Sequence, residues 1–255
     1  MNTPNTTRTL HEPGKKNIII KHRKKFKINA TGFQGVNCSS ILQITPNTRS
    51  FEFAKIFINI RLQNTEDLET QKLLQEVLLN TNLTDEEIIR YLKKTRPNQR
   101  DTIEKVNDIY FNDKISYDKA IKMNNRYINQ LNPRHGKKIE DQKNIRIKEN
   151  LKQNNLKERL EKEKRIHIVL DNYSVHHSEL TKCVTEILNI NLIYLPKNSP
   201  ELNPIEDVWR MIKKETSNKF INSKKQLEEM YTSFFHKKVD DPSLYQNWLG
   251  EFITC

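Results

Sequence analysis

Residues 165–195 place the strongest constraint on the fold of this chain. The run Arg-Ile-His-Ile-Val-Leu-Asp at 165–171 has the pattern of a short buried strand that ends on an acid, and Leu192 to Leu195 forms a second short strand. Ser178 is expected to begin a helix that runs through Leu188 between them. A strand, a helix and a strand in so compact a segment form a parallel unit, which predicts an α/β fold.

Two acids lie at the ends of this unit. Asp171 closes the first strand, and the carboxyl ends of parallel strands form the usual crevice for ligands. Glu206 lies three positions into a helix expected after Asn203 and Pro204, an N-cap residue and a first-turn proline. The intervening helix returns the chain to the neighbouring strand, so the two carboxylates can converge. Taken singly, each acid also has a structural explanation, turn chemistry for Asp171 and helix capping for Glu206.

The first sixty residues favour a β-hairpin followed by a helix. Residues 25–33 alternate polar and apolar side chains, and a second short apolar run covers 39–44. Gly32, Gly35 and Asn37 are interpreted as turn material between the two strands. Ser50 is expected to cap the following helix, and residues 18–20 fit a further strand.

The middle of the chain, residues 62–163, contains no convincing strand. Thr84 and Glu87 form a capping-box pattern that opens one helix, and apolar residues at 73–78 mark another. Residues 137–164 are highly charged with sparse apolar positions, a pattern that favours a set of solvated helices. After the parallel unit, helices are expected at about 204–219, 223–236 and 242–253.

The charge of the chain indicates an anionic partner. The formal net charge is +12, and residues 1–60 carry 10 Lys/Arg against 2 Asp/Glu, a balance of +8. A basic block of this kind can neutralise nucleic-acid phosphates, although Lys-rich surfaces can also serve solubility alone. Only 5 glycines occur in 255 residues, which argues against a glycine-looped nucleotide-binding fold.

The cysteine pattern and the apolar runs favour a cytoplasmic protein. Cys38, Cys183 and Cys255 are isolated and form no Cys-x-x-Cys pair, which excludes a zinc ribbon and fits a reducing compartment. The sequence has no apolar run near the roughly 18 residues that a membrane span needs, and its first residues lack an apolar signal region.

Two runs stand out in this part of the chain: Ile-Val-Leu-Asp-Asn-Tyr-Ser-Val-His-His at 168–177 and Leu-Pro-Lys-Asn-Ser-Pro-Glu-Leu-Asn-Pro-Ile-Glu-Asp-Val-Trp at 195–209. With these runs, residues 164–215 closely resemble the catalytic core of insertion-sequence transposases related to mariner elements, a group of the DDE superfamily endonucleases. The 34 residues from 172 to 205 that separate Asp171 from Glu206 also fit the family. The matching positions are Asp171, Asn172, His176, Leu195, Pro196, Ser199, Pro200, Leu202, Asn203, Pro204, Ile205, Glu206 and Trp209.

This resemblance implies a ribonuclease-H-like mixed sheet with flanking helices. Residues 1–61 would form the first part of the core, residues 62–163 a large helical insertion, and residues 164–222 the second part. Residues 223–255 would add C-terminal helices.

The resemblance also implies Mg²⁺-dependent DNA cleavage and strand transfer at transposon ends. Asp171 and Glu206 would be the catalytic, metal-binding carboxylates for two Mg²⁺ or Mn²⁺ ions, which activate the attacking oxygen and stabilise the leaving one. Asn172, His176 and Asn203 would shape the site or contact phosphate, with a solvent-facing helix start as the alternative for His176.

Three further features are interpreted structurally. Pro196, Pro200 and Pro204 would stiffen the loop that delivers Glu206, and Trp209 is expected to anchor the core rather than stack on a base. His177 matches nothing specific and is interpreted as a surface residue.

DNA is the expected partner, with a homodimer by analogy to transposases, and no small-molecule cofactor is expected. The basic residues expected to contact DNA lie just before and within the hairpin: Lys21, Arg23, Lys24, Lys25 and Lys27.

The family's third acid, from its first strand, is not found in the expected place. Residues 1–24 contain Glu12 as their single acid, in a turn-like context, and the first Asp is Asp67. The first strand is therefore expected to be missing, and the chain to be an N-terminally truncated transposase, or the product of a misplaced start, with impaired activity. The alternatives are a non-catalytic DNA-binding remnant and a general nuclease on the same fold.

Overall fold

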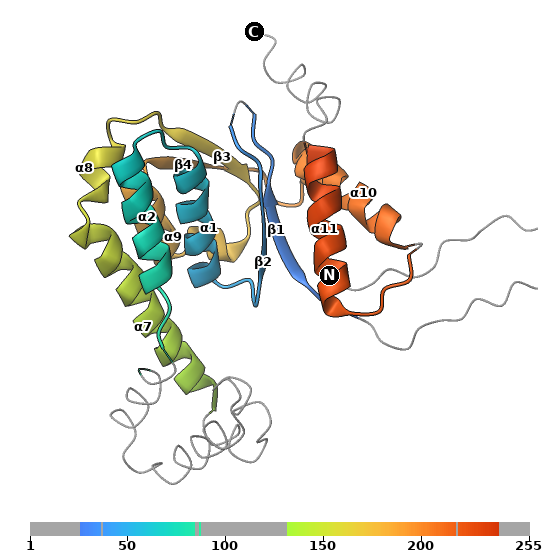
Figure 1. Ribbon diagram of the computed structural model, residues 1–255, viewed down its shortest axis with the longest axis horizontal. Helices are drawn as coiled ribbons and strands as arrows, with labels where there is room; N and C mark the ends of the chain where they lie inside the picture. Colours follow the sequence, from blue (N-terminus) through green and yellow to red (C-terminus); the bar gives the residue numbers. More distant parts are fainter. Residues whose placement is uncertain (1–25, 37, 85–86, 88–131, 218, 240–255) are drawn as a thin grey trace, which may run out of the picture. The chain divides into compact units, whose positions relative to one another are not determined.

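The computed structural model describes residues 26–36, 38–84, 87, 132–217 and 219–239 (Figure 1). They divide into two compact units: unit 1 draws on residues 1–64, 165–181 and 190–255, and unit 2 on 65–164 and 182–189. Several sequence-based expectations lie outside the described residues: the strand at 18–20, the helix at 242–253, and the positions of Glu12, Lys21, Arg23, Lys24, Lys25 and Asn37.

Unit 1 begins with the predicted hairpin. Strands β1 (Asn29–Phe33) and β2 (Ile41–Thr45) pair antiparallel, with Ala30 opposite Ile44 and Gly32 opposite Leu42. Helix α1 (Ser50–Gln63) follows, as its apolar spacing predicted. The hairpin and this helix are therefore confirmed.

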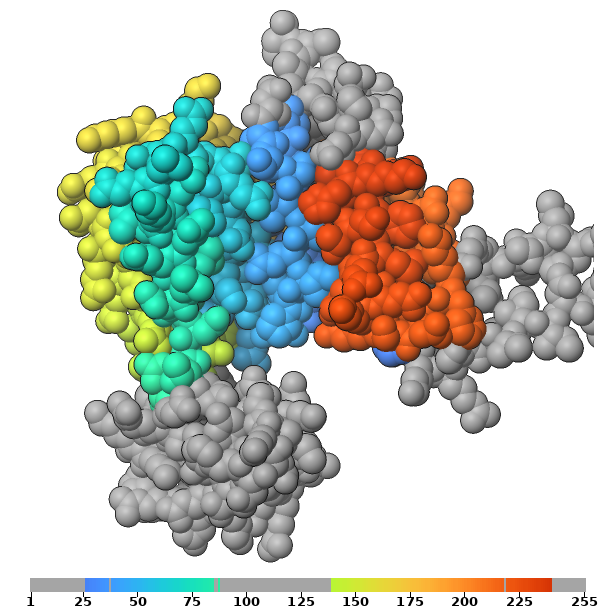
Figure 2. Space-filling model, viewed as in Figure 1, coloured from blue at the N-terminus to red at the C-terminus, as the bar shows by residue number. Residues whose placement is uncertain are grey.

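The hairpin is the middle layer between two helical layers (Figure 1). Successive side chains of a strand point to opposite faces. On one face Phe33 contacts the Phe57 ring of α1, with ring centroids 6.1 Å apart, and the Asn59 side chain donates to Gln43 at 2.9 Å. The other face packs against helices α10 (Ile205–Ser217) and α11 (Lys224–Val239), and Figure 2 shows the hairpin (blue) against α11 (red).

The cluster between the hairpin and the two C-terminal helices anchors α10. Trp209 is 7% exposed and stacks on Phe235, with ring centroids 5.7 Å apart, as a core anchor. The buried members of the cluster are Ile28, Val208, Trp209, Ile212, Ile221, Leu227, Tyr231, Phe235 and Val239.

Gly32 belongs to this layer contact and not to the turn, which corrects the sequence interpretation. It lies inside β1, where an added Cβ atom would stand 2.6 Å from Phe235 Cε2 and 2.9 Å from two ring atoms of Trp209. A glycine within a strand often marks such a close approach. The space taken by the two rings explains the absence of a side chain at this position.

The predicted parallel unit is also present. Strands β3 (Ile166–Leu170) and β4 (Ile190–Tyr194) pair in parallel and are connected through the short 3-10 helix η2 (Ser174–His177) and helix α9 (Glu179–Ile187). Ser178, expected to begin this helix, lies one residue before α9 and caps it, because its hydroxyl accepts the N–H of Thr181 at 3.2 Å.

Within the described part of the chain, the pairing gives two separate two-stranded sheets, β1 with β2 and β3 with β4. The protein is thus a mixed α/β structure of helices and small sheets, as the sequence predicted at that level. No helix in the described ranges is long and apolar enough to cross a membrane.

Unit 2 is helical. Helices α2 (Leu68–Asn80), α7 (Asn132–Gln153) and α8 (Leu156–Leu160) surround a small apolar core. In the charged segment 137–164, the sparse apolar side chains Ile147, Leu151, Leu156 and Leu160 are fully buried. The interpretation of this segment as solvated helices therefore holds only for the polar sides of the helices. The buried apolar positions on α2, α7 and α8 are Leu74, Val77, Ile147, Leu151, Leu156 and Leu160.

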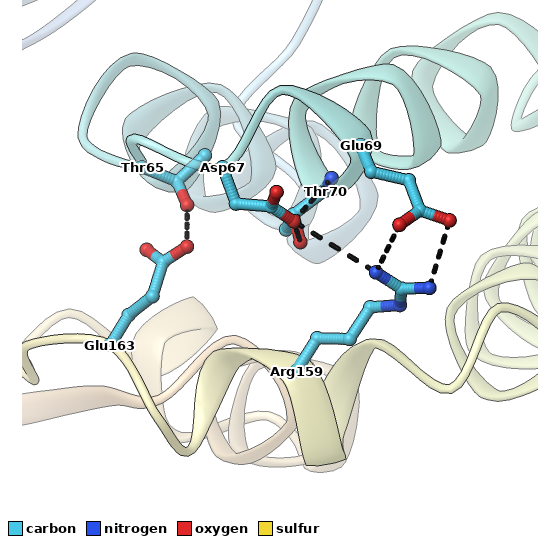
Figure 3. Close-up of polar contacts among 6 residues, drawn as sticks. All are labelled: Thr65, Asp67, Glu69, Thr70, Arg159 and Glu163. Carbon is cyan, nitrogen blue, oxygen red and sulfur yellow. Dashed lines mark hydrogen bonds and ion pairs between the residues drawn. The ribbon is translucent and has the colours of Figure 1, made fainter.

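Polar contacts join the start of α2 to α8 and the residues after it (Figure 3). Arg159 makes two hydrogen bonds of 2.9 Å to the carboxylate of Glu69, and Asp67 caps α2 by accepting the N–H of Thr70 at 2.9 Å. The hydroxyl of Thr65 donates to the carboxylate of Glu163. These contacts fix how α8 lies against α2 within unit 2.

One predicted helix cap is confirmed and one is wrong. Thr84 and Glu87 exchange hydrogen bonds of 2.8 and 3.2 Å between backbone and side chain, which is a capping box. Ser50, in contrast, is already the first residue of α1, and the N-cap is Arg49, whose side chain makes no capping bond. The reason is that the Asn47 side chain accepts the Arg49 N–H at 3.0 Å and turns the chain one residue earlier.

Candidate active site

Asp171 and Glu206 line one pocket of about 390 Å³ in unit 1. Asp171 directly follows β3, and Glu206 is the second residue of α10. The pocket is lined by Asp171, Asn172, Tyr173, Leu195, Pro196, Lys197, Asn198, Ser199, Pro200, Asn203 and Glu206. The two carboxylates singled out from the sequence are therefore brought together.

The loop from Leu195 to Pro204 connects the two sides of this pocket. Its first residue extends the pairing of the sheet, because the Leu195 N–H donates to the Leu170 carbonyl at 2.9 Å. Asn198 then adopts a left-handed backbone with φ of 60°, which Asn tolerates better than most residues. Residues Pro200–Leu202 form a 3-10 turn, and the Glu206 N–H donates to the Asn203 carbonyl at 3.0 Å. Local turn chemistry thus places Glu206 at the pocket.

The Asp171 carboxylate is 68% exposed, and its recorded polar contacts both end on one oxygen. His176 Nε2 lies 3.1 Å from Oδ1, and the Tyr173 N–H donates weakly to the same atom at 3.4 Å. Oδ2 has no partner among the described residues. Because the Asp171 carboxylate is exposed and its described contacts leave Oδ2 available, it can bind a cation in the pocket.

His176 is buried, 5% exposed, so the solvent-facing alternative for it is wrong. Its ring packs edge to face on Phe53 of α1, with centroids 4.6 Å apart, and the Tyr194 hydroxyl donates to its backbone carbonyl at 2.9 Å. Burial lowers the pKa of His176 below its usual value, and the neighbouring Asp171 carboxylate opposes that shift.

His177 has contacts that the sequence did not reveal. It is exposed, as expected, but its Nε2 pairs with the side-chain oxygen of Asn172, and its ring stacks on Tyr194 at 4.2 Å. Asn172 lines the pocket and His177 does not, so His177 holds the side chain of a pocket residue without lining the pocket itself. The five-residue separation of His177 from Asn172 is the single sequence signal that could have suggested this pair.

The other expected site residues are spread more widely. Asn203 lines the pocket, and Trp209 lies in the core cluster one turn beyond Glu206. Lys27 is exposed just before β1 and does not line the pocket, whereas Lys197, which the sequence did not single out, does. Its position on the loop between β4 and α10 places a positive charge in the lining of the same pocket as the two carboxylates.

The donor set of the pocket suits a hard divalent cation. Mg²⁺ prefers oxygen ligands and is commonly held by one or two carboxylates together with waters and substrate phosphates. Asp171 and Glu206 supply two such carboxylates. Across the described ranges, no group of three or more His, Cys, Asp or Glu side chains is placed to hold a metal ion.

Comparison with known proteins agrees with this chemistry. Residues 134–228 match the family model of the DDE superfamily endonucleases, a span that includes both Asp171 and Glu206. Enzymes of that family act on DNA and generally use divalent metal ions. No curated protein and no solved structure matches the chain.

Proposed function

We propose that this protein is the catalytic domain of a mariner-related insertion-sequence transposase, which cleaves DNA at transposon ends and transfers the strand. Asp171 and Glu206 hold the catalytic Mg²⁺ or Mn²⁺. The observation that carries the proposal is that both carboxylates, separated by the 34 residues from 172 to 205 in the sequence, line the same pocket. The match of residues 134–228 to a DNA endonuclease family supports it.

The polar residues of the pocket have separate roles in the proposed phosphoryl transfer. Bound divalent ions supply Lewis-acid stabilisation of charge at the reacting phosphate. The two carboxylates would hold the cation, and the Lys197 ammonium, which lines the same pocket, would attract the phosphate backbone of the strand. Asn172 and Asn203 offer side-chain amides that can donate to phosphate oxygens.

The two small sheets are proposed to belong to one ribonuclease-H-like sheet. Joining β1 and β3 through a central strand would convert two marginal two-stranded sheets into one larger mixed sheet. The third metal-binding carboxylate would come with that strand. An active enzyme would need that missing segment in cis or from another chain, such as the second subunit of a homodimer. Full activity depends on that contribution.

Metal binding provides the first test. Mn²⁺ binding to the purified protein is followed by electron paramagnetic resonance at neutral pH. Asp171→Asn and Glu206→Gln are each expected to weaken binding strongly. Asp207→Asn is the matched control, because Asp207 is an exposed acid paired with Arg210 and does not line the pocket. Equal Mn²⁺ affinity in all four proteins would refute the proposed metal site.

Nicking of supercoiled plasmid with Mg²⁺ or Mn²⁺ provides the second test. Weak nicking that Glu206→Gln abolishes would support a catalytic site whose activity is limited by the lack of the third carboxylate. Robust nicking abolished by Glu206→Gln would instead contradict the proposal that this chain is impaired. Nicking without any strand joining on DNA carrying the element ends would point to a general nuclease.

The second candidate is a non-catalytic DNA-binding remnant of a transposase. The resemblance implies a site of three acids. The observation that favours this candidate is that no group of three or more His, Cys, Asp or Glu side chains is placed to hold a metal ion among the described residues. Salt dependence of DNA binding cannot separate the two candidates, since both require phosphate contacts. DNA binding that is indifferent to Mn²⁺ and to Asp171→Asn would support this candidate.

A further inference from the structure

A buried imidazole lies against the exposed carboxylate of the pocket. His176 is 5% exposed, whereas the Asp171 side chain is 68% exposed, and His176 Nε2 lies 3.1 Å from Asp171 Oδ1. His176 does not line the pocket. It therefore contacts Asp171 from the protein side, where it can act on the carboxylate without touching a ligand.

The surroundings of the ring determine which nitrogen donates. Nδ1 is buried and has no hydrogen-bond partner in the described part of the chain. A proton on Nδ1 alone would bury an unpaired N–H and leave two acceptors, Nε2 and Oδ1, facing each other. A proton on Nε2 satisfies the contact in both the neutral ring and the cation. His176 thus donates from Nε2 to Asp171 whatever its charge.

The donor is held rigidly in place. The ring meets Phe53 edge to face at an interplanar angle of 89° and Tyr173 at 73°. The Tyr194 hydroxyl holds the His176 carbonyl at 2.9 Å. Packing of this kind fixes both the position and the plane of the imidazole.

A fixed donor on Oδ1 determines how the carboxylate presents its second oxygen. The other contact to Asp171, from the Tyr173 N–H, also ends on Oδ1. We propose that His176 is a positioning residue, which holds Oδ1 of Asp171 so that Oδ2 is presented to the divalent cation. This inference rests on the proposed function, because it requires Asp171 to be a metal ligand.

The expected loss of Mn²⁺ affinity follows from the usual contribution of a hydrogen bond to a metal-ligating side chain. Loss of a hydrogen bond to a ligating carboxylate typically weakens metal affinity about 10- to 100-fold. His176→Phe keeps a ring against Phe53 but removes the donor, whereas His176→Gln keeps an N–H at a similar reach. His176→Phe should therefore weaken Mn²⁺ binding about 10- to 100-fold, and His176→Gln should recover much of the loss.

Mn²⁺ affinity is measured by electron paramagnetic resonance without DNA, with circular dichroism as the check on folding. His167→Phe is the matched control, since His167 is an exposed histidine on β3 paired with Asn191. An affinity of His176→Phe equal to that of the unaltered protein, while Asp171→Asn loses binding, overturns the positioning role alone. Unchanged binding in Asp171→Asn overturns the proposed metal site instead.

A second measurement needs no substitution at His176 and covers the case in which His176→Phe does not fold. Histidine ring nitrogens are observed by nuclear magnetic resonance in ¹⁵N-histidine-labelled protein. The positioning role predicts a proton on Nε2 of His176 and a change of its resonance on adding Mg²⁺ or on Asp171→Asn. A neutral ring protonated on Nδ1, or a resonance insensitive to both changes, contradicts it.

Discussion

Replacing Gly32 by alanine should loosen the contact between the hairpin and the two C-terminal helices. The new Cβ atom would lie 2.6 Å from Phe235 Cε2 and 2.9 Å from Cη2 and Cζ2 of Trp209, well inside ordinary contact distance. Overpacking of this kind costs about 1–3 kcal/mol, and the three short contacts suggest a value of about 2 kcal/mol. Replacing glycine within a strand offsets about 0.5–1 kcal/mol of that cost. The free energy of unfolding should therefore fall by about 1–1.5 kcal/mol.

The fluorescence of Trp209 during urea unfolding measures this effect. The chain has 2 tryptophans, so Trp248 is replaced by phenylalanine in every variant, leaving Trp209 as the reporter. With a urea dependence of roughly 2 kcal/mol per molar, the midpoint should fall by roughly 0.5 M. Thr31→Ala, on the opposite face of the same strand, is the control for general loss of strand stability.

A double-mutant cycle separates the clash from other causes. Phe235→Leu removes the shortest of the three contacts and leaves the two to Trp209, so Gly32→Ala should cost about 0.5 kcal/mol less in that background. An equal cost of Gly32→Ala with Phe235 and with Leu at that position would refute the reasoning. The same contact has a functional consequence, because Trp209 lies one turn beyond Glu206. Gly32→Ala should therefore also weaken Mn²⁺ binding, and Phe235→Leu should partly restore it.

Three further predictions concern the pocket loop and unit 2. Asn198→Val should lower the free energy of unfolding by about 1 kcal/mol, because a branched residue resists the left-handed backbone, whereas Asn198→Gly should not; equal urea midpoints would contradict this. Lys197→Met should weaken binding to all DNA sequences alike and reduce the slope of log affinity against log salt by about 1, measured by fluorescence anisotropy. The Arg146 guanidinium lowers the pKa of Glu87 to about 2, so this group stabilises the fold above its ordinary pKa. That contribution is lost as pH falls toward 2, and Glu87→Gln should flatten the acid limb of stability measured by circular dichroism.

Local patterns predicted most elements of the fold. The apolar run before Asp171, the helix after Pro204 and the exchange of hydrogen bonds between Thr84 and Glu87 all depend on residues close together in the sequence. Their periods and capping chemistry are set by backbone geometry, so they are readable without knowledge of the rest of the chain. Ser50 shows the limit of that reading, since an Asn47 side chain two residues before Arg49 was enough to move the start of the helix.

The candidate site was predictable in part. Asp171 and Glu206 follow from the strand-helix-strand pattern and from the family resemblance, and both line the pocket. The place of Lys197 on that pocket was not predictable, because it depends on how the loop after β4 turns at Asn198.

The sequence by itself determined the local elements, the chemical character of the pocket and the two carboxylates most suited to bind a metal. Tertiary structure alone decided that His176 is buried, since its ring packs on Phe53 from a helix more than a hundred residues earlier. It also decided that Gly32 lies under Trp209 and Phe235. The physical reason is the same for both: burial and close packing arise from side chains distant in sequence, and no local pattern specifies which of them will meet.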